Sequence, residues 1–92
     1  MINVVVLVSG GGTNLQALID SIEGGEVTGA EIAAVISNKK DAYALTRAAE
    51  HNIPGVCISP KDYDSRDEFA AALSKALESY KADLVVLAGY LV

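Results

Sequence analysis

The chain has 92 residues, of which 51% are hydrophobic and 21% charged, so its length and composition fit one small globular domain rather than a disordered segment. Its net charge of −5 disfavours binding to nucleic acid or to acidic membrane surfaces. No apolar run is long enough to cross a membrane, and the first residues lack the basic character of a signal peptide, so we expect a cytoplasmic protein.

The first predicted strand, Ile2–Val8, leads directly into the glycine-rich segment Ser9–Gln16, which reads SGGGTNLQ. A helix is predicted to follow over Asn14–Glu23. A glycine backbone tolerates positive φ and close approach to a ligand, and the first turn of a helix carries unpaired N–H groups and the positive end of the helix dipole. This order of strand, glycine turn and helix predicts a site for a phosphorylated ligand.

Thr13 and Gln16 have the spacing of a capping box. In this motif the threonine side chain accepts a hydrogen bond from the backbone amide of the glutamine, and the glutamine side chain accepts one from the backbone amide of the threonine. The glycine segment lacks the phosphate-loop motif G-x-x-x-x-G-K-[ST], and Leu15 stands where the third glycine of G-x-G-x-x-G would fall. A glycine turn that only forms a tight corner is the alternative interpretation.

The second predicted strand, Glu31–Ser37, ends in the sequence SNKK at 37–40, without the acidic residue that binds the ribose of NAD. Its two lysines would suit the 2′-phosphate of NADP, so an NADP-binding domain is a second alternative. The next predicted helix, Ala42–His51, places the only histidine at the opposite end of the sheet from the glycine turn. We therefore expect His51 to be a solvated loop residue and a poor candidate for a catalytic base.

The third predicted strand, Gly55–Ser59, contains the only cysteine, so no internal disulfide can form. We expect Cys57 to be a small buried side chain without a redox role. A second capping box, formed by Ser65 and Glu68, precedes a helix predicted over Arg66–Tyr80.

A last strand is predicted over Asp83–Ala88, which completes an alternating βαβαβαβ pattern. A near-continuous run of apolar residues is typical of a strand that is covered on both faces. Right-handed crossovers between such strands give a Rossmann-like α/β fold. Its parallel sheet has the order 3-2-1-4 and is flanked by helices. Ligands bind at the carboxyl ends of such strands, where Arg66 is the best candidate to grip a carboxylate or phosphate.

Four segments in this order closely resemble the amino-terminal half of phosphoribosylglycinamide formyltransferase: VVVLVSGGGTNLQALID, AAVISNKKDAYALTRA, DYDSRDEF and DLVVLAGYL. The resemblance covers the whole chain. It implies transfer of a formyl group from 10-formyltetrahydrofolate to glycinamide ribonucleotide in de novo purine biosynthesis.

The resemblance also implies where the two substrates bind. The implied ribonucleotide contacts are Gly11, Gly12, Thr13, Asn14, Gly89 and Leu91, with the amides of residues 12–14 holding the phosphate. The implied folate contacts are Arg66, Leu91 and Val92. Val92 stands where many family members carry a basic residue, which puts a second charged contact to the folate in doubt.

The family's catalytic asparagine and histidine, in an N-x-H-P-S segment, and its later aspartate have no counterpart in residues 1–92. We therefore expect residues 1–92 to be the amino-terminal, phosphate-binding half of the domain, with no catalytic residue, no metal and no activity alone. The apolar stretch 84–91 would then pair with the carboxyl-terminal half or with a second copy. A non-catalytic module that binds a phosphorylated ligand or a partner chain is a third alternative.

Overall fold

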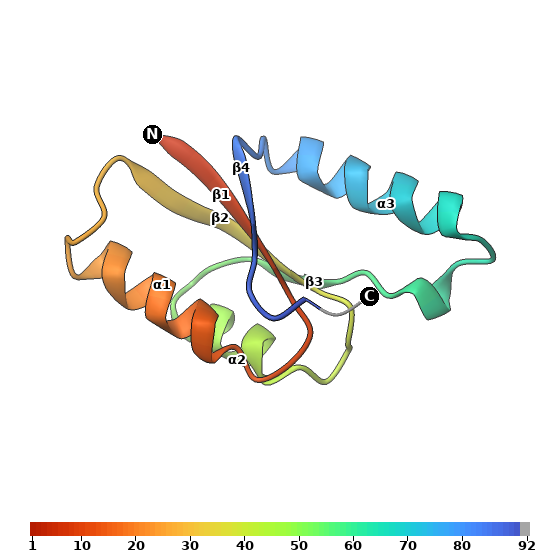
Figure 1. Ribbon diagram of the computed structural model, residues 1–92, viewed down its shortest axis with the longest axis horizontal. Helices are drawn as coiled ribbons and strands as arrows, with labels where there is room; N and C mark the ends of the chain where they lie inside the picture. Colours follow the sequence, from red (N-terminus) through yellow and green to blue (C-terminus); the bar gives the residue numbers. More distant parts are fainter. Residues whose placement is uncertain (91–92) are drawn as a thin grey trace.

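The computed structural model describes residues 1–90, which alternate between strands and helices as predicted (Figure 1). The elements are β1 (Ile2–Val8), α1 (Thr13–Glu23), β2 (Ala30–Ser37), α2 (Tyr43–Glu50), β3 (Gly55–Cys57), the 3₁₀ helix η1 (Pro60–Asp62), α3 (Arg66–Ser79) and β4 (Leu84–Leu87). No helix in this part of the chain is long and apolar enough to cross a membrane.

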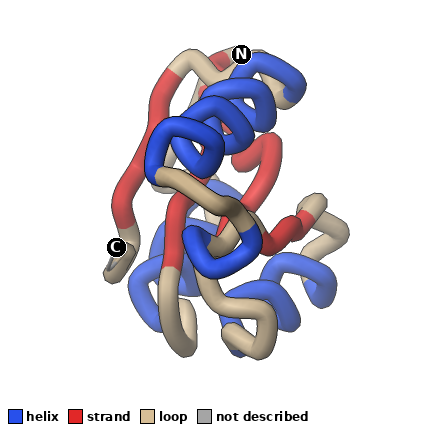
Figure 2. Tube along the Cα trace, turned by 90° about the vertical axis from the view of Figure 1, so that its right-hand side faces the viewer, coloured by secondary structure: helices blue, strands red, loops and turns tan. Residues whose placement is uncertain are grey.

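The four strands form one parallel sheet in the order β3-β2-β1-β4, which confirms the predicted topology. Helices α1 and α2 pack on one face of the sheet and α3 packs on the other, so the sheet lies between two helical layers (Figures 1 and 2). All the carboxyl ends of the strands therefore meet at one edge, where the glycine turn also lies.

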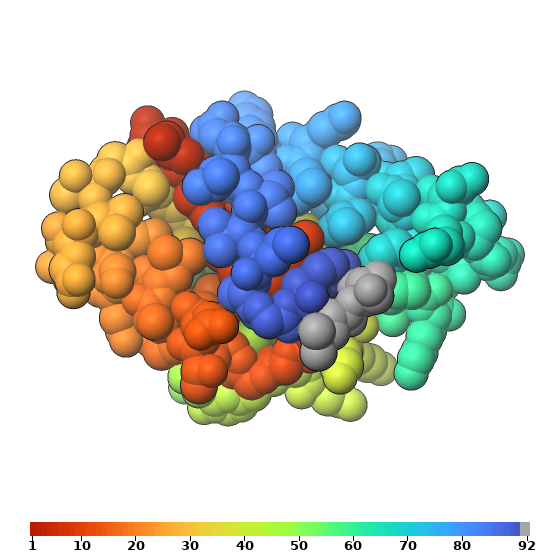
Figure 3. All heavy atoms as spheres, viewed as in Figure 1, coloured from red at the N-terminus to blue at the C-terminus, as the bar shows by residue number. Residues whose placement is uncertain are grey.

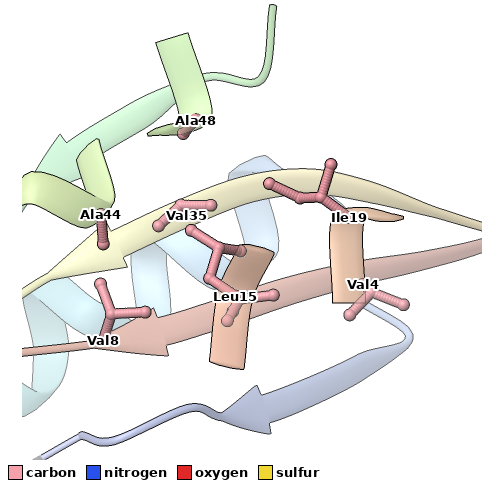
Figure 4. Packing of buried hydrophobic residues seen from close by; sticks show 8 residues of the cluster. Val4, Val8, Leu15, Ile19, Val35, Ala44 and Ala48 are labelled. Carbon is pink, nitrogen blue, oxygen red and sulfur yellow. The ribbon is translucent and has the colours of Figure 1, made fainter. Parts of the chain in front are cut away.

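The core is built on β1, where residues 4–8 are all buried. Alternate side chains of a strand point to opposite faces, so Val4 and Val8 pack with Leu15 and Ile19 of α1, as Figure 4 shows. Val5 and Leu7 point to the other face and pack against the apolar face of α3, which includes the predicted stripe Phe69, Leu73, Ala76, Leu77 and Tyr80. Because helices cover both faces of the sheet at β1, the strand is an uninterrupted run of apolar residues.

Serine side chains cap two helices, of which the cap of α3 was predicted. Ser65 caps α3, because its side-chain oxygen accepts a hydrogen bond from the amide of Glu68 at 3.1 Å. Strand β3 ends earlier than the predicted Ser59, because the Ser59 side chain instead caps η1 by accepting a bond from the amide of Lys61 at 3.3 Å.

Strand β4 lies at the edge of the sheet and pairs with β1 alone among the described strands. Three of its four apolar side chains are exposed, with Leu84 51%, Val85 39% and Leu87 66% exposed, while Val86 packs against the core. In Figure 3 the blue residues of β4 lie across the front of the molecule. The structure thus confirms an exposed apolar edge strand, while its pairing with another chain remains a prediction.

Candidate functional site

The backbone of the glycine turn has its carbonyl groups bound to the protein. They accept hydrogen bonds as follows: Gly10 from the amide of Ala44 at 3.3 Å, Gly11 from Nε of Arg47 at 2.7 Å, and Gly12 from the amide of Gln16 at 2.8 Å. These three carbonyl oxygens are therefore hydrogen-bonded to α1 and α2, so they do not repel an anion at the turn.

The amides of the same segment are free. Within residues 1–90, no hydrogen bond is donated by the backbone N–H groups of residues 10–14. These groups include the first turn of α1, whose dipole places a partial positive charge at its N-terminus. Bound carbonyls together with unpaired amides give the turn the character of an anion site, and the helix dipole alone stabilises an anion by about 0.3–1 kcal/mol.

Gly12 is fixed by both its conformation and its surroundings. It is the N-cap of α1 and has φ +81°, in the left-handed region that favours glycine. A Cβ added at this position would lie 2.7 Å from Cβ of Ala44 and 2.9 Å from its Cα. The glycine therefore lets α1 and α2 approach closely, a packing role in addition to any contact with a ligand.

The predicted capping box of Thr13 and Gln16 is wrong. Because Gly12 occupies the N-cap position, Thr13 becomes the first helical residue and no side chain caps the helix. The Gln16 side chain instead bonds to two other side chains: its Nε2 donates to Asp20 at 2.9 Å and its Oε1 accepts from Arg47 at 3.2 Å. The start of α1 therefore keeps its free amides, which a capping side chain would have used.

Arg47 is a site residue that the sequence did not reveal. From α2, its guanidinium reaches Gly11 and Gln16 and lies 4.9 Å from the ring centre of Tyr43. It thereby fixes the glycine turn to α1 and brings a positive charge next to the turn. No motif spacing marks this role, because the contact joins segments 36 residues apart.

The predicted environment of His51 is corrected. Rather than being solvated, its side chain is 26% exposed, and its Nδ1 lies 3.0 Å from an oxygen of Glu23. Its other ring nitrogen lies 3.3 Å from Nε2 of Gln16. Because its ring joins the end of α2 to α1, His51 has a structural role, and both nitrogens already have protein neighbours.

A cavity of about 1310 Å³ opens beside the glycine turn. It lies at the carboxyl edge of the sheet and is formed by the segments that follow β1, β2 and β3. Its basic side chains are Lys39, Lys40, Lys61 and Arg66, and its acidic side chains are Asp41 and Asp62. The cavity continues from the glycine turn toward β3, so an anion at the turn would have space for a larger ligand nearby.

Cys57 lies in the wall of this cavity and is only partly buried, whereas a small buried side chain was predicted. Desolvation raises the pKa of its thiol above the usual value, and the carboxylate of Asp62 adds to the rise. A raised pKa keeps the thiol protonated near neutral pH and disfavours a nucleophilic role.

The remaining predicted contacts fall partly within the described residues. Gly89 follows β4 at the same edge as the glycine turn, since the preceding Ala88 donates a backbone hydrogen bond to Leu7 at 2.9 Å. Arg66 is the first residue of α3 and is exposed at the cavity. Leu91 and Val92 lie outside the described residues. No group of three or more potential metal ligands is found within residues 1–90.

Comparison with known proteins identifies the family of this chain. Residues 2–92 match the family described as formyl transferase. The chain belongs to this family.

Two relatives match almost the whole of this chain. A phosphoribosylglycinamide formyltransferase of Haemophilus influenzae is 45% identical over 91 residues, which cover 99% of this chain and 42% of that protein. The trifunctional purine biosynthetic protein adenosine-3 of Drosophila melanogaster is 43% identical over 89 residues, which cover 96% of this chain and 7% of that protein.

Solved structures give the same relationship. Glycinamide ribonucleotide transformylase 1 from Symbiobacterium toebii superposes with a TM-score of 0.94 and 44% identity, over 100% of this chain and 43% of that one. The phosphoribosylglycinamide formyltransferase of Coxiella burnetii, in complex with CHES, gives a TM-score of 0.93 and 45% identity, over 99% and 42%. The chain thus spans less than half the length of these relatives, and its fold is theirs over that span.

Proposed function

We propose that this chain is the phosphate-binding half of a phosphoribosylglycinamide formyltransferase. The complete domain would transfer a formyl group from 10-formyltetrahydrofolate to the amine of glycinamide ribonucleotide. The observation that carries the proposal is the glycine turn, where three carbonyls are bound inward and the amides of residues 10–14 are unpaired. The two bacterial relatives, both formyltransferases of this substrate by name, support it.

In this proposal, the amides of Gly12, Thr13 and Asn14 bind the phosphate of the ribonucleotide, with Gly11 beside them. Gly89 follows the neighbouring strand at the same end of the sheet, has φ +73°, and has no atom within 4 Å of where a Cβ would lie. Together with Leu91, it would line the cleft between the two substrates through its backbone. Residues 1–92 would thus position the acceptor amine without taking part in the chemistry.

The folate would approach from the other side of the cleft. Arg66 is exposed, and its planar guanidinium offers two parallel hydrogen bonds to a carboxylate of the folate tail. Val92 would contribute an apolar contact. In an enzyme completed by the rest of the domain, Arg66→Ala should raise the KM for the folate and leave the KM for the ribonucleotide unchanged. The reverse result would mean that the two substrates have been assigned to the wrong sides.

Formyl transfer needs groups that move protons and stabilise negative charge. The amine nitrogen attacks the formyl carbon and a tetrahedral oxyanion forms. The bond from that carbon to the folate nitrogen then breaks; the attacking amine loses one proton and the leaving folate nitrogen gains one. The reaction therefore needs a proton acceptor and a donor for the oxyanion. His51 is held between Glu23 and Gln16, away from this role. We propose that both groups belong to the part of the family domain beyond these residues, and that the complete enzyme is cytoplasmic.

A titration of the ¹⁵N-labelled chain tests the proposed site. Inorganic phosphate and glycinamide ribonucleotide should both shift the amide resonances of residues 10–14. NADPH, the probe for the alternative nucleotide-binding function, should leave them unchanged.

The substitution Gly11→Asp gives a sharper test because a Cβ at this position meets nothing within 4 Å, so the fold should tolerate a side chain. The added carboxylate should weaken phosphate binding about 5- to 30-fold, corresponding to a charge repulsion of about 1–2 kcal/mol near the protein surface. Gly11→Asn has the same shape without the charge and is the control. Equal affinities of the two variants, or NADPH shifts without ribonucleotide shifts, would overturn the proposal.

A further inference from the structure

A series of hydrogen bonds connects His51, at the end of α2, to the glycine turn. Nε of Arg47 donates to the carbonyl of Gly11 at 2.7 Å, and its Nη1 donates to Oε1 of Gln16 at 3.2 Å. Nε2 of Gln16 in turn lies 3.3 Å from Nε2 of His51. All three side chains are partly buried, so water replaces these contacts less readily than on an open surface. Through these contacts, the protonation state of the His51 ring can affect the turn.

The orientation of the Gln16 amide is fixed by two charged neighbours. Its Nε2 donates to the carboxylate of Asp20 at 2.9 Å, and its Oε1 accepts from the guanidinium of Arg47. Reversing the amide would place its oxygen against the carboxylate and its NH2 group against the guanidinium, so both contacts would become repulsive. The NH2 group of Gln16 is therefore the donor toward His51.

This orientation determines the tautomer of neutral His51. Because Gln16 donates, Nε2 of the ring must accept, and the single proton of the neutral ring lies on Nδ1. Nδ1 lies 3.0 Å from a carboxylate oxygen of Glu23, which accepts this proton in a hydrogen bond. Neutral His51 thus completes an unbroken series of donors and acceptors between Glu23 and the carbonyl of Gly11.

Protonation of His51 breaks this series. The protonated ring is a donor at both nitrogens, so its Nε2–H would face the NH2 group of Gln16. Gln16 must then move away or reverse its amide, and either change weakens its bond to Arg47. The charged groups bonded to these side chains are Glu23 at the ring, and Asp20 and Arg47 at Gln16. Glu23 attracts the charged ring, whereas Gln16 opposes it.

We propose that His51 is a positioning residue for the glycine turn and makes anion binding there depend on pH. The inference rests on the proposed function, in which the amides of the turn bind the phosphate of the ribonucleotide. When His51 is neutral, Gln16 and Arg47 hold the carbonyl of Gly11 away from the ligand. When His51 is protonated, this carbonyl is held less firmly and the anion binds more weakly. Histidine changes its charge between about pH 5 and 8.

The predicted direction of the pH effect is opposite to that of simple charge attraction. Lowering the pH adds positive charge to the chain, and attraction through space would then strengthen the binding of an anion. Loss of the hydrogen-bonded support for the turn weakens binding instead. The sign of the effect therefore distinguishes the two explanations.

NMR of the chain tests the connection without any ligand. His51 is the only histidine, so its ring nitrogens give a single set of signals. At about pH 8 these signals should show a protonated Nδ1 and an unprotonated Nε2. As the pH falls, the carbonyl ¹³C resonance of Gly11 should move together with the ring signals, and it should not do so in His51→Gln. The opposite tautomer, or a Gly11 resonance that does not follow the ring, would overturn the proposal.

Sulfate titrations measure the effect on anion binding, because sulfate, unlike phosphate, keeps its double charge over this pH range. The parent should bind sulfate about 2- to 10-fold more weakly at about pH 5.5 than at about pH 8, which corresponds to the net contribution of one hydrogen bond. His51→Gln keeps an uncharged acceptor for Gln16 and is the control. It should match the parent at the higher pH and lose this fall. His51→Lys carries a permanent positive charge and cannot accept from Gln16, so at the higher pH it should bind as weakly as the parent does at the lower.

Two outcomes of the sulfate titrations would overturn the proposal. Stronger binding by His51→Lys, or a parent whose affinity rises as the pH falls, would show that charge attraction alone acts. A fall that persists unchanged in His51→Gln would assign the effect to another group. If the parent binds no sulfate at either pH, the proposed function fails, while the Gly11 resonance still decides whether His51 controls the turn.

Discussion

Arg47 offers the most specific test of how the glycine turn is held in place. Its Nε donates to the carbonyl of Gly11 at 2.7 Å, and its Nη1 donates to Gln16 at 3.2 Å. The substitution Arg47→Gln shortens the side chain and removes its charge, so both contacts and the stacking on Tyr43 are lost. The carbonyl of Gly11 would then be free to rotate toward the space in which the anion binds.

The cost can be worked out from these contacts. A hydrogen bond from a charged donor contributes about 1.5–3 kcal/mol, and an exposed cation–π contact contributes about 0.5–1 kcal/mol. Because the guanidinium is only partly buried, water replaces part of both contributions, and we expect a loss of about 1–2 kcal/mol in the free energy of unfolding. Phosphate affinity should fall about 5- to 30-fold, because a positive charge and the fixed orientation of the turn are both lost.

Urea unfolding and phosphate titration of Arg47→Gln measure the two effects separately. Lys75→Gln is the matched control, because it removes one positive charge from an exposed side chain of α3 that lies outside the cavity. The control should change the unfolding free energy by less than about 0.5 kcal/mol. If Arg47→Gln matches the control in both stability and phosphate affinity, the bonds to the glycine turn do not position it and the reasoning is refuted.

Three further predictions concern packing, titration and the sheet edge. Gly12→Ala should lower the unfolding free energy by about 2–4 kcal/mol, because it combines a left-handed backbone with a close contact to α2, and an unchanged urea midpoint would contradict this. The raised pKa of Cys57 means that the unfolded chain loses its thiol proton first, so stability should fall more steeply above about pH 8.5 in the parent than in Cys57→Ser. Parallel curves of unfolding free energy against pH for the two proteins would contradict this prediction. Leu87→Lys should reduce self-association in sedimentation velocity, and a parent that stays monomeric over a wide concentration range would show that the edge does not pair.

The order of the sheet could be predicted from the sequence because each strand carries a local signal. The runs at 4–8 and 33–36 are apolar over both faces, and each intervening helix permits a right-handed crossover to a parallel strand. The crossover through α3 carries the chain from β3 at one edge to β4 at the other. The capping of α3 was equally local, since Ser65 and Glu68 are three residues apart. The position of the glycine turn at the carboxyl edge follows from the same local information.

The errors arose where contacts between distant segments decided the outcome. The spacing of Thr13 and Gln16 fits a capping box, but the close approach of α1 and α2 requires Gly12 at the cap and draws Gln16 toward Arg47. His51 follows a helix in sequence, yet its contact with Glu23 spans 28 residues and its side chain is only 26% exposed. Such contacts depend on how two helices pack against each other. The residue pattern within either helix does not predict that packing.

The central claim is that residues 1–92 bind and position the ribonucleotide while the rest of the domain moves the protons. The most direct measurement follows the folate absorbance during formyl transfer, first with the purified chain alone and then after adding the separately produced carboxyl-terminal part of the Haemophilus influenzae relative, which is 45% identical over the shared span. We predict no turnover above the uncatalysed rate for the chain alone and measurable turnover for the mixture. Robust turnover by the chain alone, persisting in His51→Ala, would contradict the account and place the chemistry within residues 1–92.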